Sequence, residues 1–220
     1  MNVAPAALCL AAITAASPLG ACQTALLLAM DVSNSVDAGE FRLQTEGLAA
    51  ALQDPEITEI LVRDRVSLSV LQWSGIPDQE ISIGWTTIYS PAQVAALAQQ
   101  VRDMPRAFIL SDTAPAEALI AALAHITQGP DCVRRVIDLS GDGTPNALGG
   151  AEVRHLRRRA ERAGVTINGL AIESLGLAIT NFYHRQVITG DGFVETARGY
   201  RDYARAIRRK MLREISRVFG

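Results

Sequence analysis

The sequence is poor in several residue types that carry chemistry in enzymes and metal proteins. Its 220 residues include three cysteines and three histidines. The histidines lie at positions 125, 155 and 184, which is not the spacing of metal ligands. The only lysine is Lys210. No Ser-His-Asp or Cys-His arrangement with a recognisable local motif is present, so the sequence does not indicate a hydrolase that uses such a nucleophile.

Strong net charge and long apolar runs are also missing. The formal net charge is −2 at pH 7, which is too small to indicate nucleic acid or an acidic membrane as the main partner. Beyond the N-terminal segment there is no run of about 18 apolar residues, so no internal transmembrane span is expected. The length suits one α/β domain, and an apolar content of 49% is ordinary for a globular protein.

The N-terminal segment has the composition of an export signal. Residues 1–24 carry no charged side chain and contain the apolar run AALCLAAITAA, followed by the small residues Gly20 and Ala21. We therefore predict a secretory signal peptide over residues 1–21 and a mature domain over residues 22–220, located in the periplasm or secreted. The alternative is a buried first helix, since the segment lacks the basic start of a typical signal.

Removal of residues 1–21 would leave two cysteines, Cys22 and Cys132. An even pair in an oxidising compartment is a candidate disulfide. The sequence LGAC at residues 19–22 also resembles a lipoprotein signal, in which Cys22 would be lipidated. The composition leaves open a disulfide, lipidation of Cys22 and two free thiols.

Apolar patterning alternates between strand-like and helix-like segments. The predicted strands cover residues 25–30, 66–73, 81–85, 133–139, 165–172 and 193–195. The predicted helices cover residues 36–52, 91–102, 115–126, 149–163, 181–188 and 200–218. This alternation predicts an α/β fold with a doubly wound, mostly parallel sheet, helices on both faces and one short antiparallel edge strand at 81–85.

Polar loops follow two of the predicted strands. Residues 31–35 (DVSNS) come directly after the first strand, and residues 140–143 (SGDG) follow the strand at 133–139. Between them in sequence, Thr113 precedes the Ala-rich helix at 115–126. Doubly wound sheets bind ligands beyond the carboxyl ends of their strands. Carboxylate and hydroxyl oxygens are hard donors, which suit magnesium, manganese or calcium.

These loops resemble the metal-ion-dependent adhesion site of von Willebrand factor type A domains. The resemblance covers residues 24–218 and implies the Rossmann-like fold of that family. It assigns five metal ligands: Asp31, Ser33, Ser35, Thr113 and Asp142. In the family the hydroxyls bind the ion directly, and the aspartates bind it directly or through water. The resemblance therefore implies a divalent cation, Mg²⁺ first with Mn²⁺ or Ca²⁺ as alternatives, and a partner protein or peptide that supplies a carboxylate.

Three stretches are similar to an uncharacterised bacterial branch of that family, a domain of unknown function: RRVIDLSGDGTPN, VTINGLAI and AIRRKMLREI. One departure from the general family pattern concerns the residues before Thr113, where Ser111 and Asp112 replace a frequent Gly-Gly pair. The added charge of Asp112 would either tighten metal binding or weaken the attraction of the ion for an acidic partner.

The family's strand order also bears on the two cysteines. It places the first strand beside the strand at 133–139 and parallel to it. Cys22 and Cys132 would then lie at the same end of neighbouring strands, within reach of a disulfide. The resemblance thus implies a Cys22–Cys132 disulfide. Lipidation of Cys22 would leave a tether of only two or three residues before a central strand.

The function implied is that of a metal-dependent binding module of the cell envelope without enzymatic activity. Magnesium-dependent phosphoryl transfer is an alternative, because it also uses aspartates at strand ends. It is less favoured, since the acid/base position two residues after Asp31 is Ser33 and no lysine other than Lys210 exists. A structural domain with a vestigial metal site is a third hypothesis. Asp138, inside a predicted strand, is expected to make internal hydrogen bonds.

Overall fold

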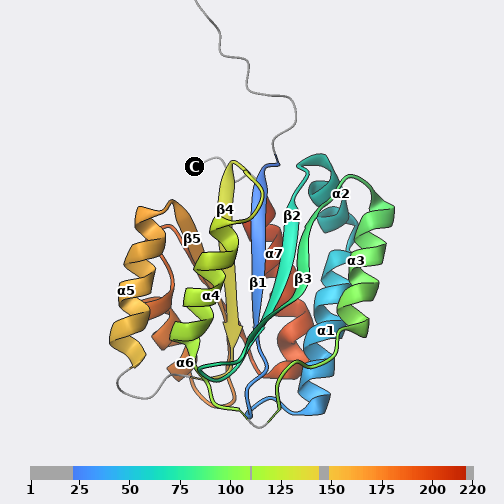
Figure 1. The fold of residues 1–220 in the computed structure, drawn as a ribbon. Helices are drawn as coiled ribbons and strands as arrows, with labels where there is room; N and C mark the ends of the chain where they lie inside the picture. Colours follow the sequence, from blue (N-terminus) through green and yellow to red (C-terminus); the bar gives the residue numbers. More distant parts are fainter. Residues whose placement is uncertain (1–21, 110, 144–148, 217–220) are drawn as a thin grey trace, which may run out of the picture.

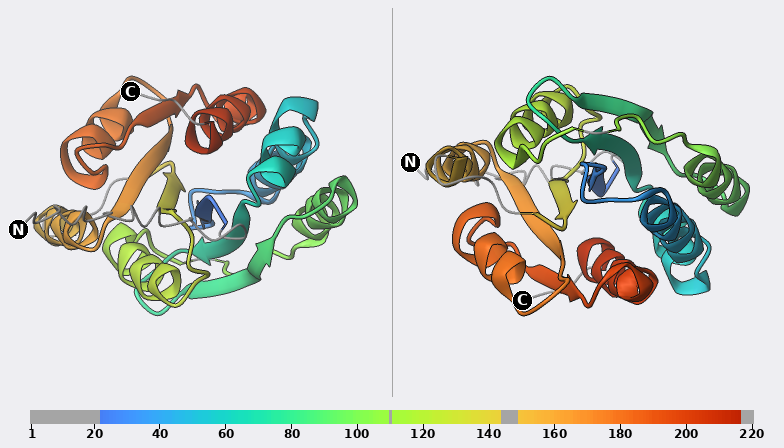
Figure 2. Two further views of the ribbon diagram at one scale, coloured as in Figure 1. Left: turned by 90° about the horizontal axis from the view of Figure 1, so that it is seen from above. Right: turned by 90° about the horizontal axis from the view of Figure 1, so that it is seen from below.

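The computed structural model describes residues 22–109, 111–143 and 149–216. A six-stranded sheet with the order β3-β2-β1-β4-β5-β6 forms the central layer, and helices pack on both of its faces (Figures 1 and 2). The strands are β1 (Thr24–Asp31), β2 (Ser67–Trp73), β3 (Gln79–Thr87), β4 (Arg134–Gly141), β5 (Val165–Ile172) and β6 (Val194–Ala197). The helices are α1 (Ala38–Leu52), α2 (Pro55–Arg63), α3 (Pro91–Asp103), α4 (Pro115–Thr127), α5 (Gly149–Arg162), α6 (Ala178–Phe182) with the π-helical segment η1 (Tyr183–Val187), the 3₁₀ turn η2 (Tyr200–Asp202) and α7 (Tyr203–Ile215).

The pairing of the strands confirms the predicted fold class. β1 is central and runs parallel to both β2 and β4, and β5 and β6 extend the parallel part of the sheet. Only the pair β2–β3 is antiparallel within the described sheet. β3 is nine residues long and so exceeds the predicted strand at 81–85. The extension arises because β3 pairs with β2 along the whole of that strand.

The unbroken apolar sequence of β1 follows from burial on both faces of the sheet. Leu26, Leu28 and Met30 belong to the core under α1, α3 and α7. Leu27 and Ala29 alternate with them and belong to the core under α4 and α5. A strand that alternates between two apolar layers has no position for a polar side chain between its first residue, Thr24, and its last, Asp31.

Three helical regions differ from the prediction. α2 was not predicted, although its start is marked in the sequence: Asp54 caps it by accepting hydrogen bonds from the N–H groups of Glu56 and Ile57, and Pro55 occupies its first position. The helix expected at 181–188 begins earlier, as α6, and continues as η1. The closing helix expected at 200–218 consists of η2 and then α7.

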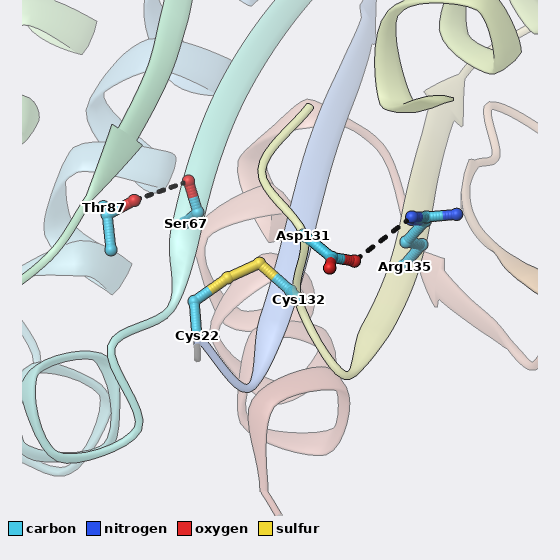
Figure 3. Close-up of a disulfide and its surroundings, with 6 residues drawn as sticks. All are labelled: Cys22, Ser67, Thr87, Asp131, Cys132 and Arg135. Carbon is cyan, nitrogen blue, oxygen red and sulfur yellow. Dashed lines mark hydrogen bonds and ion pairs between the residues drawn. A yellow bond between two sulfur atoms is a disulfide. The ribbon is translucent and has the colours of Figure 1, made fainter. Parts of the chain in front are cut away.

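A disulfide closes the end of the sheet where β1 and β4 begin. Cys22 and Cys132 are bonded, with their Cα atoms 4.7 Å apart, and each lies two positions before the first residue of its strand (Figure 3). The backbone N–H of Val133 donates to the carbonyl of Cys22 over 3.0 Å and continues the strand pairing there. The predicted disulfide is therefore confirmed. The bond uses the sulfur atom that lipidation of Cys22 would modify.

Residues 1–21, over which the signal peptide is predicted, lie outside the described part of the chain. Among the described helices, none combines the length and the apolar character needed to cross a membrane.

A buried ion cluster attaches α7 to the sheet. Lys210 Nζ lies 2.7 Å from Asp138 Oδ1 on β4, and it also pairs with Glu214 one turn further along α7. Asn168 on β5 donates to Glu214 Oε1 over 2.9 Å. Burial raises the pKa of both carboxyl groups, while the charge of Lys210 acts in the opposite direction. Asp138 is thus an internal residue held by an ion pair, and its partner is the only lysine of the chain.

Candidate metal centre

The first loop of the candidate site is positioned by the end of β1. Asp31 is the last residue of β1 and is fully buried. Its Oδ1 accepts a hydrogen bond of 2.8 Å from the backbone N–H of Ser33, which forms a tight turn directly after the strand. Gln44 of α1 donates to the carbonyl of Asp31 over 3.1 Å. The turn and the helix together hold the carboxylate at the carboxyl edge of the sheet.

The second part of the site is Thr113, two residues before α4. Its Oγ1 donates to Ser33 Oγ over 3.1 Å. Ser74, which follows β2, holds this segment in place: its carbonyl accepts from the N–H of Ala114 and its Oγ donates to the carbonyl of Asp112, both over 2.9 Å. Asp112, the departure from the family pattern, takes part through its backbone, and its side chain is exposed.

The third part is Asp142, directly after β4. Ser35 Oγ donates to Asp142 Oδ1 over 2.5 Å, and the Oγ atoms of Ser33 and Ser35 are 3.1 Å apart. Because the proton of Ser35 is directed at Asp142, the hydrogen bond between the two serines is donated by Ser33. A chain of three hydrogen bonds therefore leads from Thr113 to Ser33, from Ser33 to Ser35 and from Ser35 to Asp142.

All five predicted residues thus meet at the carboxyl edge of the sheet. We call the side-chain oxygens of these residues the oxygen cluster: Asp31, Ser33, Ser35, Thr113 and Asp142. They come from three loops, after β1, before α4 and after β4.

Asp31 is the electrostatic centre of this cluster. Its Oδ2 is buried and has no hydrogen-bond partner among the described residues. Burial raises the pKa of Asp31 to about 7; hydrogen bonds from Ser33 oppose this, and the negative charge of Asp142 adds to it. A buried carboxylate that faces a second carboxylate and lacks a partner is stabilised by a cation. The local chemistry therefore fits a bound metal ion.

Gly141 leaves the space that this arrangement needs. A Cβ at this position would lie 2.9 Å from Asp31 Oδ2, 2.9 Å from the Tyr183 hydroxyl and 3.1 Å from Cζ2 of Trp73. The Tyr183 hydroxyl is buried and, like Asp31 Oδ2, has no hydrogen-bond partner within the described residues. Burial, and then the charge of Asp31, raises its pKa well above the usual value, so this hydroxyl is neutral.

The types of donor narrow the choice of ion. Within the described residues there is no group of three or more His, Cys, Asp or Glu side chains that could hold a metal. The oxygen cluster contains two carboxylates and three hydroxyls. A donor set made only of oxygen suits Mg²⁺, Mn²⁺ or Ca²⁺ better than a soft metal ion.

Two residues that complete the site were not found from the sequence. The Tyr200 hydroxyl donates to Asp142 Oδ2 over 2.9 Å. Arg106 Nη2 donates to the carbonyls of Val32 and Ser33 over 2.9 and 2.8 Å and so holds the first loop from the outside. Arg106 lies between predicted elements, and Tyr200 stood out only as the first residue of the closing helix. Neither position carries a local signal for its contact.

Comparison with known proteins gives the family of the chain and structures that share its fold. The sequence model of one family, described as "Protein of unknown function (DUF1194)", matches residues 21–219. No curated protein matches the sequence. Many solved structures are similar to it.

One similar structure is proximal thread matrix protein 1 from the mussel byssus with a zinc-occupied MIDAS motif (16% identity, 88% of this chain and 46% of that chain, TM-score 0.64). Another is a von Willebrand factor type A protein from Catenulispora acidiphila (14% identity, 89% and 43%, TM-score 0.62). A third is the manganese-loaded TRAP protein of Plasmodium vivax (15% identity, 88% and 73%, TM-score 0.55). The chain spans about half of the length of the mussel protein. At these identities the likeness shows the fold, which is that of von Willebrand factor type A domains.

Proposed function

We propose that this chain, which belongs to the family described as protein of unknown function (DUF1194), is a metal-dependent binding module. The oxygen cluster binds one divalent cation, and the cation binds a carboxylate of a partner protein or peptide. The observation that carries this proposal is the meeting of five oxygen-bearing side chains, one of which is Asp31, whose buried Oδ2 has no partner among the described residues.

Mg²⁺ is the ion we favour, with Mn²⁺ and Ca²⁺ as alternatives. Mg²⁺ prefers six oxygen ligands in octahedral geometry. Five side chains leave at least one position of an octahedral ion to water or to a group from outside. Three of the five donors are neutral hydroxyls, so the ion keeps an attraction for an anionic oxygen of a partner. The zinc and manganese named for the mussel and Plasmodium structures support a divalent cation in this fold.

The module is proposed to act in the periplasm or outside the cell. Disulfides persist in oxidising compartments and are rare in the cytosol. The Cys22–Cys132 bond therefore supports export, as does the composition of residues 1–21.

Phosphoryl transfer is less well supported than binding. The residue two positions after Asp31 is Ser33, whose hydroxyl is hydrogen-bonded within the cluster. Lys210, the only lysine of the chain, is fully buried and paired with Asp138 and Glu214. It is not placed to contact a phosphate on the surface. We therefore propose that the chain is not an enzyme.

The proposal is tested by calorimetric titration of the oxidised, metal-stripped mature chain with Mg²⁺, Mn²⁺ and Ca²⁺. We expect saturable binding at one site, lost in Asp31→Asn and in Thr113→Ala. Asp131→Asn is the matched control, because Asp131 is exposed and lies at the opposite end of the sheet, next to the disulfide (Figure 3). Absence of binding in a folded chain, or equal binding in all variants, would contradict the proposal and favour a structural domain with a vestigial site.

A further inference from the structure

A pocket of about 780 Å³ opens at the same edge of the sheet as the oxygen cluster. Its walls are the loop 173–177 after β5, the strand β6, and residues around η2 and in the first turns of α7. The carboxyl ends of β4, β5 and β6 point in one direction because these strands are parallel. The loop 173–177 in the pocket wall and the oxygen cluster therefore lie at the same edge of the sheet.

Tyr200 connects the pocket to the cluster. Arg198 and Asp202, which line the pocket, lie two residues before and after Tyr200. The hydroxyl of Tyr200 donates to Asp142 Oδ2 over 2.9 Å. Two residues of chain span at most about 7 Å. The pocket wall is thus separated from Asp142 by one tyrosine side chain and a short piece of backbone.

The charges that line the pocket balance one another. They are three acids and three arginines: Glu173, Glu195, Asp202, Arg198, Arg205 and Arg209. Arg205 lies 2.6 Å from Asp202 and 3.3 Å from Glu195. Glu173 is buried, and its Oε1 accepts from the N–H of Thr180 over 2.7 Å. A partner side chain that binds in this pocket therefore does not need to carry a charge.

Two of the residues that line the pocket are apolar and strongly exposed. Leu175 and Leu177 have 89% and 58% of their surface accessible. Leu175 has the largest exposed fraction among the large hydrophobic side chains of the described residues. Two exposed leucines beside a pocket are a site where contact with a partner removes apolar surface from water.

The edge of β6 favours insertion of a side chain over addition of a strand. Arg205 Nη2 donates to the carbonyl of Thr196 on β6 over 3.2 Å. A strand that paired along this edge would have to displace the guanidinium, which is also held by Asp202. A side chain that enters between loop 173–177 and α7 leaves this contact intact.

We propose that this pocket accepts a large aliphatic or aromatic side chain from the same partner segment whose carboxylate reaches the metal ion. The inference rests on the proposed function and specifies its ligand class: an acidic residue followed or preceded, within about four positions of extended chain, by a residue such as leucine or phenylalanine.

Capped peptides with one aspartate in a Gly-Ser background test this inference. Leucine, phenylalanine or serine is placed one to four positions from the aspartate, on either side. Their dissociation constants for the oxidised chain in saturating Mg²⁺ or Mn²⁺ are measured by NMR titration, with the methyl signals of Leu175 and Leu177 observed. At the matching spacing, the leucine or phenylalanine peptide is expected to bind about tenfold more tightly than the serine peptide and to shift these signals.

The double variant Leu175→Ser/Leu177→Ser should remove this preference and leave the affinity for Mg²⁺ alone unchanged. Ile120→Ser on α4 is the matched control, since Ile120 is 43% exposed and does not line the pocket. Equal affinity for leucine and serine peptides at every spacing, or a preference that survives the double variant, would overturn this inference and leave metal binding standing. Failure of the chain to bind the metal ion would overturn the proposed function and this inference with it.

Discussion

At the scale of single residues, Asp31 and Gly141 define the candidate metal centre. A carboxylate that is fully buried with one free oxygen is costly unless a positive charge balances it. The hydrogen bonds of Ser33 reach only the other oxygen, Oδ1. Gly141 leaves open the volume next to Oδ2. The volume that Gly141 leaves open is therefore next to the oxygen of Asp31 that has no hydrogen-bond partner among the described residues.

Gly141→Ala should disturb this point. A methyl group 2.9 Å from Asp31 Oδ2 and from the Tyr183 hydroxyl forces both to move. We expect the free energy of unfolding to fall by about 1–3 kcal/mol and Mg²⁺ affinity to fall with it, measured by urea unfolding and calorimetry. Gly84→Ala on β3 is the control, because nothing lies within 4 Å of its Cβ position. Equal stability and metal affinity in both variants would contradict the crowding argument.

Tyr200→Phe tests the positioning of Asp142. The variant keeps the ring and removes the hydroxyl that donates to Asp142 Oδ2. Groups that orient a metal ligand typically affect affinity by roughly 10-fold or more. We therefore expect Mg²⁺ affinity to fall about tenfold while the far-ultraviolet spectrum is unchanged. Tyr89→Phe, whose side chain is exposed, should leave the affinity unaltered. An unchanged affinity in Tyr200→Phe would mean that the serine hydrogen bond alone orients Asp142.

At the scale of elements, α7 is attached to the sheet by a charged cluster inside an apolar layer. Lys210 is opposed by two carboxyl groups, Asp138 and Glu214, so full ionisation would leave an excess negative charge in the core. Asn168 donates a hydrogen bond to one carboxylate oxygen of Glu214. The cluster therefore favours one protonated carboxyl group, which links the docking of α7 to pH.

Glu214→Gln should show this link. Burial, with a further contribution from the charge of Asp138, raises the pKa of Glu214 from 4.5 to about 7, although Lys210 lowers it. The folded chain then binds more protons than the unfolded chain between these values. The stability from protonated Glu214 is fully present below pH 4.5 and is lost as the pH rises to about 7. The amide does not titrate, so relative to wild type the variant should gain up to about 3 kcal/mol between pH 5 and pH 8.

Urea unfolding of wild type and variant at the two pH values measures this difference. Glu56→Gln is the control, because the side chain of Glu56 is 64% exposed. A pH-independent difference between wild type and Glu214→Gln would show that Glu214 is ionised throughout this range.

At the scale of the whole molecule, one end of the sheet carries the disulfide and the other end carries the candidate metal centre. The disulfide joins the amino ends of β1 and β4 (Figure 3), and the oxygen cluster lies beyond the carboxyl ends of the same two strands. A cross-link over 110 residues acts mainly by restricting the unfolded chain. Its effect on stability should therefore be large, and its effect on the metal centre small.

Reduction of the disulfide, or the double variant Cys22→Ser/Cys132→Ser, should lower the free energy of unfolding by about 4–5 kcal/mol. The Mg²⁺ dissociation constant of the folded chain should stay within about twofold of its original value, since the affected residues lie at the opposite end of β1. Urea unfolding and calorimetry on the same samples measure both quantities. A loss of metal binding in a chain that remains folded would show that the two ends are coupled.

The predicted and observed secondary structures differ at two kinds of segment. In one the sequence signal is short, and in the other the segment is held by pairing with another strand. α2 has a capping aspartate and a proline at its start, yet it is a nine-residue helix between two longer predicted segments. The antiparallel strand β3 was predicted too short, because its ends are held by β2 and not by their own apolar pattern. In both cases the packing of neighbouring elements extends or completes a segment that is marginal by itself.

The sequence by itself determined the fold class, and its resemblance to von Willebrand factor type A domains singled out the five members of the oxygen cluster. Unbroken apolar strands require burial on both faces, and polar residues right after such strands must gather at one edge of a parallel sheet. Only the tertiary structure decided that Tyr200 contacts Asp142, that Lys210 is buried beside Asp138, and that a pocket opens next to the cluster. The reason is physical. Tyr200 and Asp142 are 58 residues apart in the sequence. Contacts between such distant residues depend on how the helices pack on the sheet, and the local pattern of apolar residues does not predict that packing.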